Sequence, residues 1–153
     1  MIVAGIDIGA RGGVALYDGA TWRTWQASRS APLWRIVRDV AASNDVAAWY
    51  VERPIILSHD GRKGQQTTGR GVGQLDVVLD GLRRVDVHPS TWQAALGLLS
   101  GGRRNRAQHK ATLRATASRM VGRDLDEGEA DAALIARFGF AALSSASRGR
   151  LNA

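Results

Sequence analysis

The sequence predicts an α/β fold in which a mixed sheet of five strands is flanked by helices. Three strand-like segments follow one another within the first 27 residues, separated by short turns. Strand-like and helix-like segments then alternate, and the chain ends in three helix-like segments. A meander followed by alternating strands and helices implies antiparallel and parallel pairs in one sheet, with helices on its faces. The length of 153 residues suits a single domain, residues 1–153.

The first strand is predicted at the amino terminus, in MIVAGIDIG. Its alternate residues are apolar on both faces, apart from Asp7, which is typical of a buried, central strand. The segments GGVALYDG and TWRTWQA predict the second and third strands, and the pair Asp18-Gly19 predicts the turn between them.

The remaining elements follow from apolar periodicity and from turn residues. Residues 31–42 have helical spacing, and VAAWYVERP predicts a strand that Pro54 ends. A glycine-rich, polar stretch at 55–74 precedes the next helix, and Ser90 and Gln93 predict a capping box. The later predictions are a helix over 74–84, a strand over 85–89, a helix over 90–98, a basic loop over 99–106, helices over 107–120 and 129–143, and a flexible tail over 146–153.

The charge of the chain indicates a polyanionic partner. The formal net charge is +7, and no acidic residue occurs between Val87 and Arg123. A solvated basic helix is the alternative, but the length of the acid-free stretch favours a surface that binds the phosphates of nucleic acid. The chain has no cysteine, which excludes disulfides and thiolate metal sites, and it has neither a bilayer-spanning apolar run nor a signal peptide pattern. A cytoplasmic protein is therefore expected.

Two carboxylates lie in or at the end of predicted strands. Asp7 interrupts an apolar strand, where an acid is costly unless it is paired or bound to a metal. It could instead bond the amides of the following turn. Glu52 ends the strand before Pro54, at the edge where α/β sheets collect ligands, although an ion pair with Arg53 would also explain it.

The last predicted helix adds a third carboxylate. Asp131 shares a stripe with Leu134, Ile135 and Phe138, so it faces the core. Glu127 lies four residues earlier on the same face and is the candidate for a fourth carboxylate of the site, with Asp126 as the alternative. Asp126 and Glu129 can also serve as the N-cap and N3 residues of this helix.

These acids favour a site for hard cations. Mg²⁺ prefers oxygen ligands and keeps several waters, and two such ions about 4 Å apart can promote phosphodiester cleavage. The three histidines lie in surroundings that do not favour a histidine-metal centre.

Taken in order, these segments resemble the RuvC-like Holliday junction resolvases, particularly the short bacteriophage forms. The resemblance is carried by five segments: GIDIGARGGVAL, YVERP, GRGVGQLDVVLDGL, VHPSTWQAALGL and DEGEADAALIARFG. It extends from Ile2 to Gly139 and implies a ribonuclease-H-like fold and metal-dependent nicking of branched DNA. A two-fold homodimer is expected, since resolving a junction requires two nicks on opposed strands. The resemblance also implies a bacterial or phage-infected host cell.

The resemblance assigns roles to individual residues. It implies that Asp7, Glu52 and Asp131 bind two Mg²⁺ ions, which Mn²⁺ can replace, and that Glu127 completes the set. In the bacterial enzymes the final pair of acids is three residues apart, which here would place Gly128 in the ligand position. Lys110 matches a basic position that faces the scissile phosphate. The residues expected to bind DNA are Arg62, Lys63, Gln65, Gln66, Arg70, Arg103, Arg104, Arg106, Lys110 and Arg114.

One family feature is missing, and two other functions are possible. Many relatives have an aromatic residue in the loop that enters the junction, but SHDGRKGQQTTGRGVG has none, so polar contacts are expected there instead. GIDIG also occurs in actin-like and sugar-kinase ATPases, although it is a weak signal alone. A non-catalytic module for branched DNA is the other alternative.

Overall fold

The computed structural model describes residues 1–9, 11–53, 62–99 and 105–151. Its ten elements follow the predicted order of strands and helices. They are β1 (Ile2–Asp7), β2 (Gly13–Tyr17), β3 (Trp22–Gln26), α1 (Leu33–Ser43), β4 (Val46–Glu52), α2 (Arg62–Val78), β5 (Arg84–Val87), α3 (Pro89–Ala95), α4 (Arg106–Val121) and α5 (Glu127–Leu151).

The strands form one mixed five-stranded sheet in the order β3-β2-β1-β4-β5. The meander β1-β2-β3 is antiparallel, whereas β4 pairs parallel to both β1 and β5. The strand β1 is therefore central, as its apolar residues on both faces predict. The turn between β2 and β3 contains Gly19 at φ +104°, next to Asp18, whose side chain accepts from the amide nitrogens of Ala20 and Thr21.

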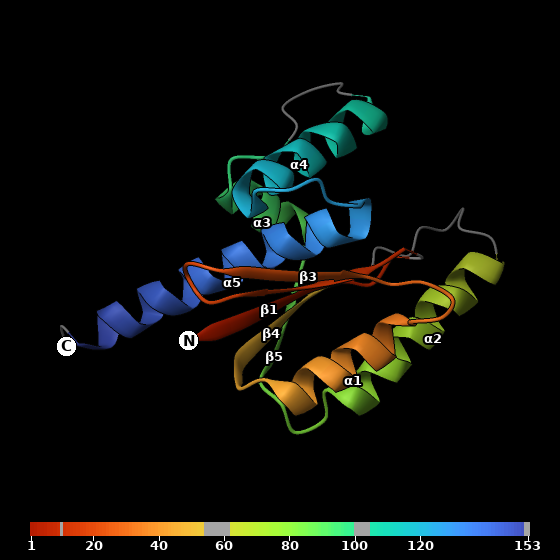
Figure 1. The fold of residues 1–153 in the computed structure, drawn as a ribbon, viewed down its shortest axis with the longest axis horizontal. Coiled ribbons are helices and arrows are strands. Elements are labelled where there is room, and N and C mark those ends of the chain that lie inside the picture. Colours follow the sequence, from red (N-terminus) through yellow and green to blue (C-terminus); the bar gives the residue numbers. More distant parts are fainter. Residues whose placement is uncertain (10, 54–61, 100–104, 152–153) are drawn as a thin grey trace.

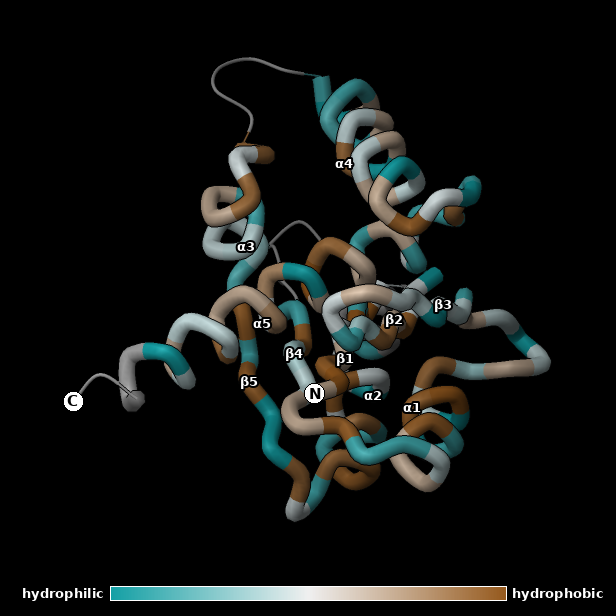
Figure 2. The backbone as a smooth tube through the Cα atoms, turned by 60° about the vertical axis from the view of Figure 1, so that its left-hand side comes forward, coloured by the Kyte–Doolittle hydropathy of each residue, from teal (hydrophilic) through white to brown (hydrophobic). Residues whose placement is uncertain are grey.

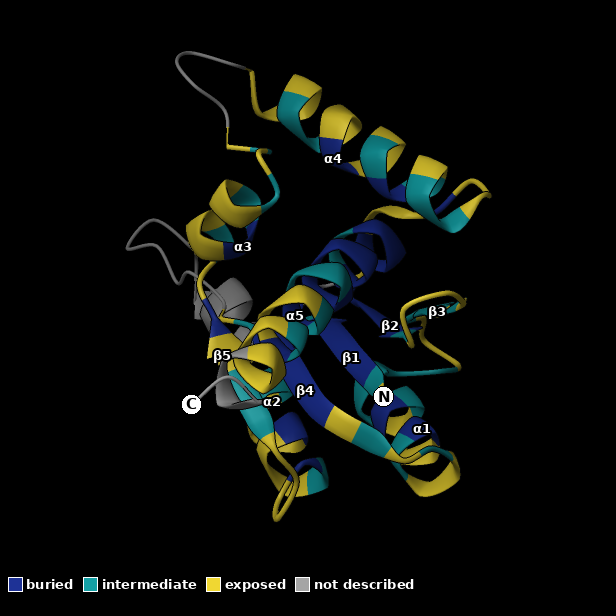
Figure 3. Ribbon diagram, turned by 90° about the vertical axis from the view of Figure 1, so that its left-hand side faces the viewer, coloured by how far each residue is buried: buried dark blue, intermediate teal, exposed yellow. Residues whose placement is uncertain are grey.

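Helices cover both faces of the sheet, with α3, α4 and α5 on one side and α1 and α2 on the other (Figure 1). The first layer packs Trp92, Leu113 and Leu134 against the sheet. The second packs Val37 and Leu75 against the opposite face. Most of β1 and β4 is buried between the two layers (Figure 3). The fold class predicted from the sequence is confirmed.

The helix α5 lies against β1 and β2 at very short range. A Cβ on Gly5 would overlap the backbone of Ala132, and a Cβ on Gly128 would overlap the carbonyl oxygen of Arg11. Gly12 and Gly128 also form an isolated bridge between the β1–β2 turn and the start of α5. Only glycine fits such an approach, because any side chain would push the helix away. The start of α5 is thus fixed beside the end of β1.

The prediction for α2 was wrong about its start. We expected a helix from residue 74, yet α2 begins at Arg62, so residues 62–73 are helical rather than a loop. The glycines and polar residues of this stretch have low helix propensity, which conceals the helix in the sequence. Buried Leu75 in its second half, and Leu79 directly after its end, anchor it to the core, and α2 also contacts α1.

Two other details concern helix ends. The cap of α3 is His88, whose side chain accepts from the amide of Ser90, and Pro89 is the first helical residue; the predicted capping box from Ser90 was wrong. The backbone of α5 is helical up to Leu151, so it includes most of the segment expected to be a flexible tail. That flexibility stays a prediction. Within the described residues, no helix combines the length and the apolar character that crossing a membrane requires.

Candidate active site

Two of the predicted acids lie side by side at the carboxyl edge of the sheet. Asp7 ends β1 and Glu52 ends β4, and these parallel strands are in register up to the pair Ile6–Val51. Residues an even number of positions apart on a strand lie on the same face of the sheet, so Asp7 shares a face with Val3, and Glu52 with Tyr50. Val3 and Tyr50 pack in the layer of α3, α4 and α5, and both carboxylates therefore point toward that layer. One oxygen of Asp7 accepts from the amide of Gly9 at 3.0 Å. The predicted turn contact of Asp7 is therefore present, alongside its electrostatic interaction with Glu52.

Asp131 approaches the same edge from above the sheet. It lies in the second turn of α5, with the fully buried Leu134 and Ile135 on the same stripe and the partly buried Phe138 packed on the core. The close approach of α5 at Gly5 and Gly128 brings this part of the helix over the end of β1. Asp131 is thus part of the inner face of the helix, as its spacing predicts.

The three carboxylates raise one another's pKa. Burial, and then the charge of Glu52, raise the pKa of Asp7 to about 7. Burial, and then the charge of Asp131, raise the pKa of Glu52 to about 7. Burial, and then the charge of Asp7, raise the pKa of Asp131 to about 7. Each acid is therefore close enough to another to repel it, and together they form a cluster in which full ionisation is unfavourable without positive charge.

Lys110 supplies positive charge to this cluster. Its ammonium group lowers the pKa values of both Asp7 and Asp131, although burial and acid repulsion outweigh it. The Nζ atom also forms an ion pair with Glu127 at the first residue of α5. Both partners of this pair are substantially exposed, at 42% and 53%. Lys110 thus connects Glu127 to the half-buried Asp7 and Asp131, which interact in turn with Glu52, and five predicted site residues lie in one region.

The donor set fits a hard divalent cation. It consists of carboxylate oxygens whose ionised form is disfavoured by burial and by mutual repulsion, and a bound cation relieves both. Among the described residues, no three acidic or histidine side chains are close enough to enclose a metal ion by themselves. Mg²⁺ needs only one or two carboxylates, because it keeps waters and binds substrate phosphates. The predicted shell of four carboxylates stays a prediction.

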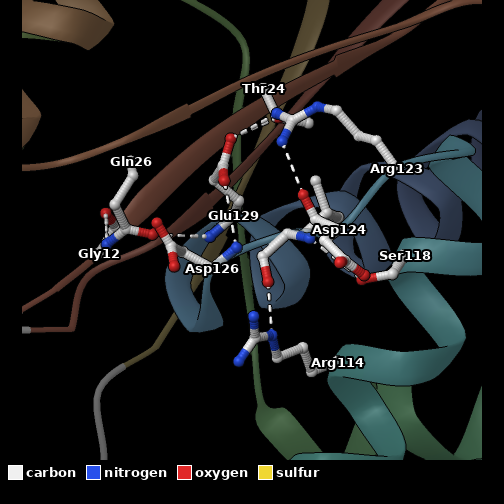
Figure 4. Close-up of polar contacts among 10 residues, drawn as sticks. Gly12, Thr24, Gln26, Arg114, Ser118, Arg123, Asp124, Asp126 and Glu129 are labelled. Carbon is white, nitrogen blue, oxygen red and sulfur yellow. Dashed lines mark hydrogen bonds and ion pairs between the residues drawn. The ribbon is translucent and has the colours of Figure 1, made fainter.

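Asp126 and Glu129 have a different role from the buried cluster. The Oε2 atom of Glu129 accepts from the backbone amide of Asp126 at 3.2 Å, which is the N-cap and N3 arrangement expected at the start of this helix. The Oε1 atom accepts from Thr24 and Arg123, each at 2.6 Å (Figure 4). Burial raises the pKa of Glu129, but the hydrogen bonds from Arg123, Thr24 and Asp126 outweigh it and hold the pKa below its ordinary value.

Gly128 is unsuitable as the site of a ligand. It is buried against the β1–β2 turn, and any side chain there would overlap the backbone of Arg11 and Gly12. The three-residue spacing of the bacterial enzymes therefore has no equivalent in this chain. Glu127 is the remaining acid that both precedes Asp131 and contacts Lys110.

Sequence reasoning missed Trp92 as part of the site. Its indole is buried at 1% exposure, and Nε1 donates to Oε2 of Glu52 at 2.7 Å. This hydrogen bond opposes the rise in the pKa of Glu52. The only signal in the sequence was the position of Trp92 within VHPSTWQAALGL, one of the segments that carry the family resemblance. An apolar aromatic residue in a predicted helix is otherwise typical of the core.

The predicted DNA-binding residues lie on two helices and one further segment. Arg106, Lys110 and Arg114 are on α4, which lies at one end of the molecule and has hydrophilic residues along its length (Figure 2). The Nε atom of Arg114 donates to the carbonyl of Leu125 at 2.5 Å. Gln66 and Arg70 are exposed on α2, which also contains Arg62, Lys63 and Gln65. Arg103 and Arg104 lie outside the described residues, as does Pro54.

Comparison with known proteins rests on structure alone. No protein-family model matches the chain, and no curated protein matches its sequence. A structure of Thermus thermophilus RuvC in complex with Holliday junction substrate is similar, with a TM-score of 0.63 and 19% identity over 90% of this chain and 91% of that one. A second structure of Thermus thermophilus RuvC has a TM-score of 0.61 and 20% identity over 90% and 92% of the two chains.

A viral resolvase has a similar fold. The fowlpox virus resolvase, in complex with substrate Holliday junction DNA, gives a TM-score of 0.54 and 13% identity over 95% of this chain and 98% of that one. At these identities the likeness concerns the fold, and it extends over nearly the whole of each chain. The protein therefore has the fold that RuvC and the fowlpox virus resolvase share.

Proposed function

We propose that the protein is a divalent-metal-dependent endonuclease that nicks four-way DNA junctions. The observation that carries this proposal is the cluster of three carboxylates at the ends of β1 and β4 and on the inner face of α5, close enough to raise one another's pKa, with Lys110 beside them. Their place at the carboxyl edge of the sheet is where α/β folds bind ligands. The likeness of the fold to two resolvases solved with Holliday junction DNA supports this substrate.

The half-buried acids of the cluster would hold the metal. Asp7, Glu52 and Asp131 supply oxygen donors to Mg²⁺ or Mn²⁺, with Glu127 as the fourth acid and two ions per site. When bound, a divalent cation would lower the pKa of a water molecule, so that it attacks more readily, and would stabilise the negative charge on the leaving oxygen. Hydrolysis joins a water oxygen to phosphorus, breaks one P–O ester bond and leaves a proton on the departing oxygen.

Lys110 is proposed to bind the scissile phosphate. Its ion pair with Glu127 is exposed, and such pairs contribute at most about 1 kcal/mol. A phosphate oxygen can therefore replace Glu127 at Nζ. The same exchange frees the Glu127 carboxylate to act as the fourth metal ligand.

The basic residues of α4 and α2 are proposed to bind the DNA backbone. Arg106 is exposed at the start of α4, a helix without any acidic residue. Phosphate contacts add affinity and salt dependence without reading sequence. Replacing Arg106 with Gln, or Arg103 and Arg104 with Ala, should lower the slope of log Kd against log salt by about one for each phosphate that the protein no longer neutralises. An unchanged slope would exclude the residue from the interface.

The test of the function is cleavage of a set of branched DNAs. Purified protein is incubated with a four-way junction, a replication fork, a flap and a linear duplex, with Mg²⁺, Mn²⁺ or chelator. We expect paired nicks on opposed strands of the junction, only with a divalent metal, and a protein that sediments as a homodimer. Asp7→Asn should abolish cutting and keep junction binding in Ca²⁺. Asp39→Asn is the matched control, since Asp39 is an exposed acid paired with Arg38.

The other candidate functions give different results in the same experiment. A non-catalytic module would bind the junction and leave every DNA uncut with either metal. An actin-like or sugar-kinase ATPase would hydrolyse ATP, or gain thermal stability from it, and leave the junction uncut. Unchanged cutting by Asp7→Asn would contradict the assignment of the site even if the protein is a nuclease.

A further inference from the structure

The hydrogen bond between Trp92 and Glu52 has a chemistry suited to a metal ligand. The indole N–H can only donate, and it carries no charge. It therefore holds Oε2 of Glu52 without the positive charge by which a lysine or arginine would compete with a cation. The second carboxylate oxygen, Oε1, accepts no hydrogen bond from the part of the chain that the structure describes, and it can bind another partner. A neutral donor on one oxygen is thus a means of orienting a carboxylate whose other oxygen binds metal.

Trp92 is itself held close to the end of β4. Val87, the last residue of β5, is the register partner of Glu52, and its carbonyl accepts from the amide of Arg53 at 2.8 Å. His88 caps α3 directly after β5, and Pro89 starts the helix. Trp92 follows in the first turns of this helix, so the indole is fixed relative to the strand that contains Glu52.

The helix α3 is also tied to α4. The Oε1 atom of Gln93 lies 3.1 Å from Nε2 of His109, and Trp92 and Leu113 belong to the same hydrophobic cluster. His109 directly precedes Lys110, which faces Asp7 and Asp131. The pair of helices therefore reaches the carboxylates at two points, one through a neutral donor and one through a cation.

We propose that Trp92 is a positioning residue that orients the Glu52 carboxylate for a divalent cation. This inference rests on the proposed function, because it assumes that Glu52 binds metal. Trp92 is almost fully buried and donates to the Glu52 carboxylate, so it would act through Glu52 and not by touching DNA itself. Its removal should weaken metal binding and leave the rate at saturating metal much less affected.

The test compares two buried tryptophans. Trp92→Phe keeps an aromatic ring but removes the donor, and Trp49→Phe is the control, since Trp49 is equally buried on the same strand as Glu52 but packs on the opposite face of the sheet. Binding of Mn²⁺ is followed through the loss of the free-ion EPR signal, without DNA. Trp92→Phe should raise the Mn²⁺ concentration for half saturation by roughly 10–100-fold. Trp49→Phe should leave it within about twofold of the wild type.

Cleavage separates positioning from a general structural defect. In Trp92→Phe the Mg²⁺ concentration for half-maximal cutting should rise in parallel with the Mn²⁺ midpoint, while the rate at saturating Mg²⁺ recovers. In the Glu52→Gln background, Trp92→Phe should not change Mn²⁺ binding further, because the carboxylate that Trp92 orients is already absent. A folded Trp92→Phe protein with the wild-type midpoint would overturn the inference.

A variant that removes only the donor covers the case in which Trp92→Phe does not fold. Benzothienylalanine at position 92 has the shape of tryptophan with sulfur in place of N–H, and it should produce the same weakening. A wild-type midpoint in that protein would overturn the inference as well. Wild-type protein that binds no Mn²⁺ would overturn both proposals, whereas one that binds Mn²⁺ but cuts no branched DNA would overturn the proposed function alone.

Discussion

Two carboxylates on the first turns of α5, Glu129 and Asp131, have opposite electrostatic environments. Glu129 is buried at 7% exposure, yet three hydrogen-bond donors hold its pKa below the ordinary value. Asp131 is less buried, yet its pKa is raised to about 7. The difference comes from the surroundings of each acid. Hydrogen bonds from Arg123, Thr24 and the Asp126 amide outweigh the effect of burial on the pKa of Glu129, whereas burial, and then the charge of Asp7, raise the pKa of Asp131.

This comparison distinguishes Glu129, an acid that stabilises the fold, from Asp131, an acid suited to binding a cation. The network around Glu129 joins β3, the α4–α5 connection and the start of α5, so its ionised form contributes to stability (Figure 4). The cluster of Asp7, Glu52 and Asp131 costs stability in its ionised form, which is common at functional sites. Substitutions at the two positions should therefore act on different properties of the protein.

The largest effect is expected from Asp131→Asn. Substitution of groups behind a metal ligand costs roughly 10–100-fold, so loss of a ligand should lower the cutting rate by at least about 100-fold. The variant should be as stable as the wild type or more so in chelator, because a repelled carboxylate is removed. Mg²⁺ should raise the Tm of the wild type and leave that of the variant unchanged. A variant that loses stability together with activity would show that Asp131, like Glu129, stabilises the fold, and would contradict the distinction between the two acids.

The next largest effect is expected from Gly128→Ala, which displaces the helix that contains both acids. The new Cβ would overlap the carbonyl oxygen of Arg11, and overpacking of this kind costs about 2–3 kcal/mol. Both the free energy of unfolding and the cutting rate should fall, since Asp131 moves away from Asp7. Gly73→Ala on α2 is the control: a Cβ there meets nothing within 4 Å and should be neutral or stabilising. Urea unfolding curves and a cleavage assay decide between these outcomes.

The sequence predicts the fold well because most elements depend on local apolar periodicity. The order of ten elements and the central position of β1 follow from patterns that each span only a few residues. The start of α2 could not be predicted, since packing on α1 and on the core overrides the low helix propensity of residues 62–73. Tertiary contacts are not visible in a local pattern.

In the site, too, the residues that follow a local sequence pattern could be predicted, and those that depend on tertiary contacts could not. Asp7, Glu52 and Asp131 could be predicted because each is an acid at an apolar position of a strand or helix. Trp92 could not, because its partner is 40 residues away and a buried tryptophan is typical of any core. The spacing alternatives around Gly128 also required the structure, since only the contact with Arg11 shows that no side chain fits there.

A smaller effect is expected from Glu129→Gln, the matched substitution to Asp131→Asn on the same helix. Removing the charge weakens the hydrogen bonds from Arg123 and Thr24, which should cost about 1–2 kcal/mol, because Arg123 is half exposed and water replaces part of the interaction. Cutting at a temperature where the protein is folded should stay within about threefold of the wild type, a loss smaller than that from removing a group behind a metal ligand. Urea unfolding at pH 7 and the cleavage assay measure the two quantities. A loss of cutting as large as in Asp131→Asn would place Glu129 in the active site and remove the distinction.

The smallest effect concerns Asp18, an acid in the β2–β3 turn that has donors but no burial. The Thr21 hydroxyl, followed by the amides of Thr21 and Ala20, lowers the pKa of Asp18 to about 2. Because the folded pKa is below the ordinary 3.8, its stabilising contribution is present above about pH 4 and is lost as the pH falls toward 2. The urea midpoint of wild type should therefore exceed that of Asp18→Asn at pH 6, and the gap should narrow by pH 3. A gap that stays constant would mean that the hydrogen bonds do not act on the charged form.

A narrowing gap at this exposed position would show that donors alone, without burial, are enough to favour an ionised carboxylate. No donor among the described residues forms a hydrogen bond with Asp131, so burial, and then the charge of Asp7, raise its pKa without the opposing effect that acts on Asp18.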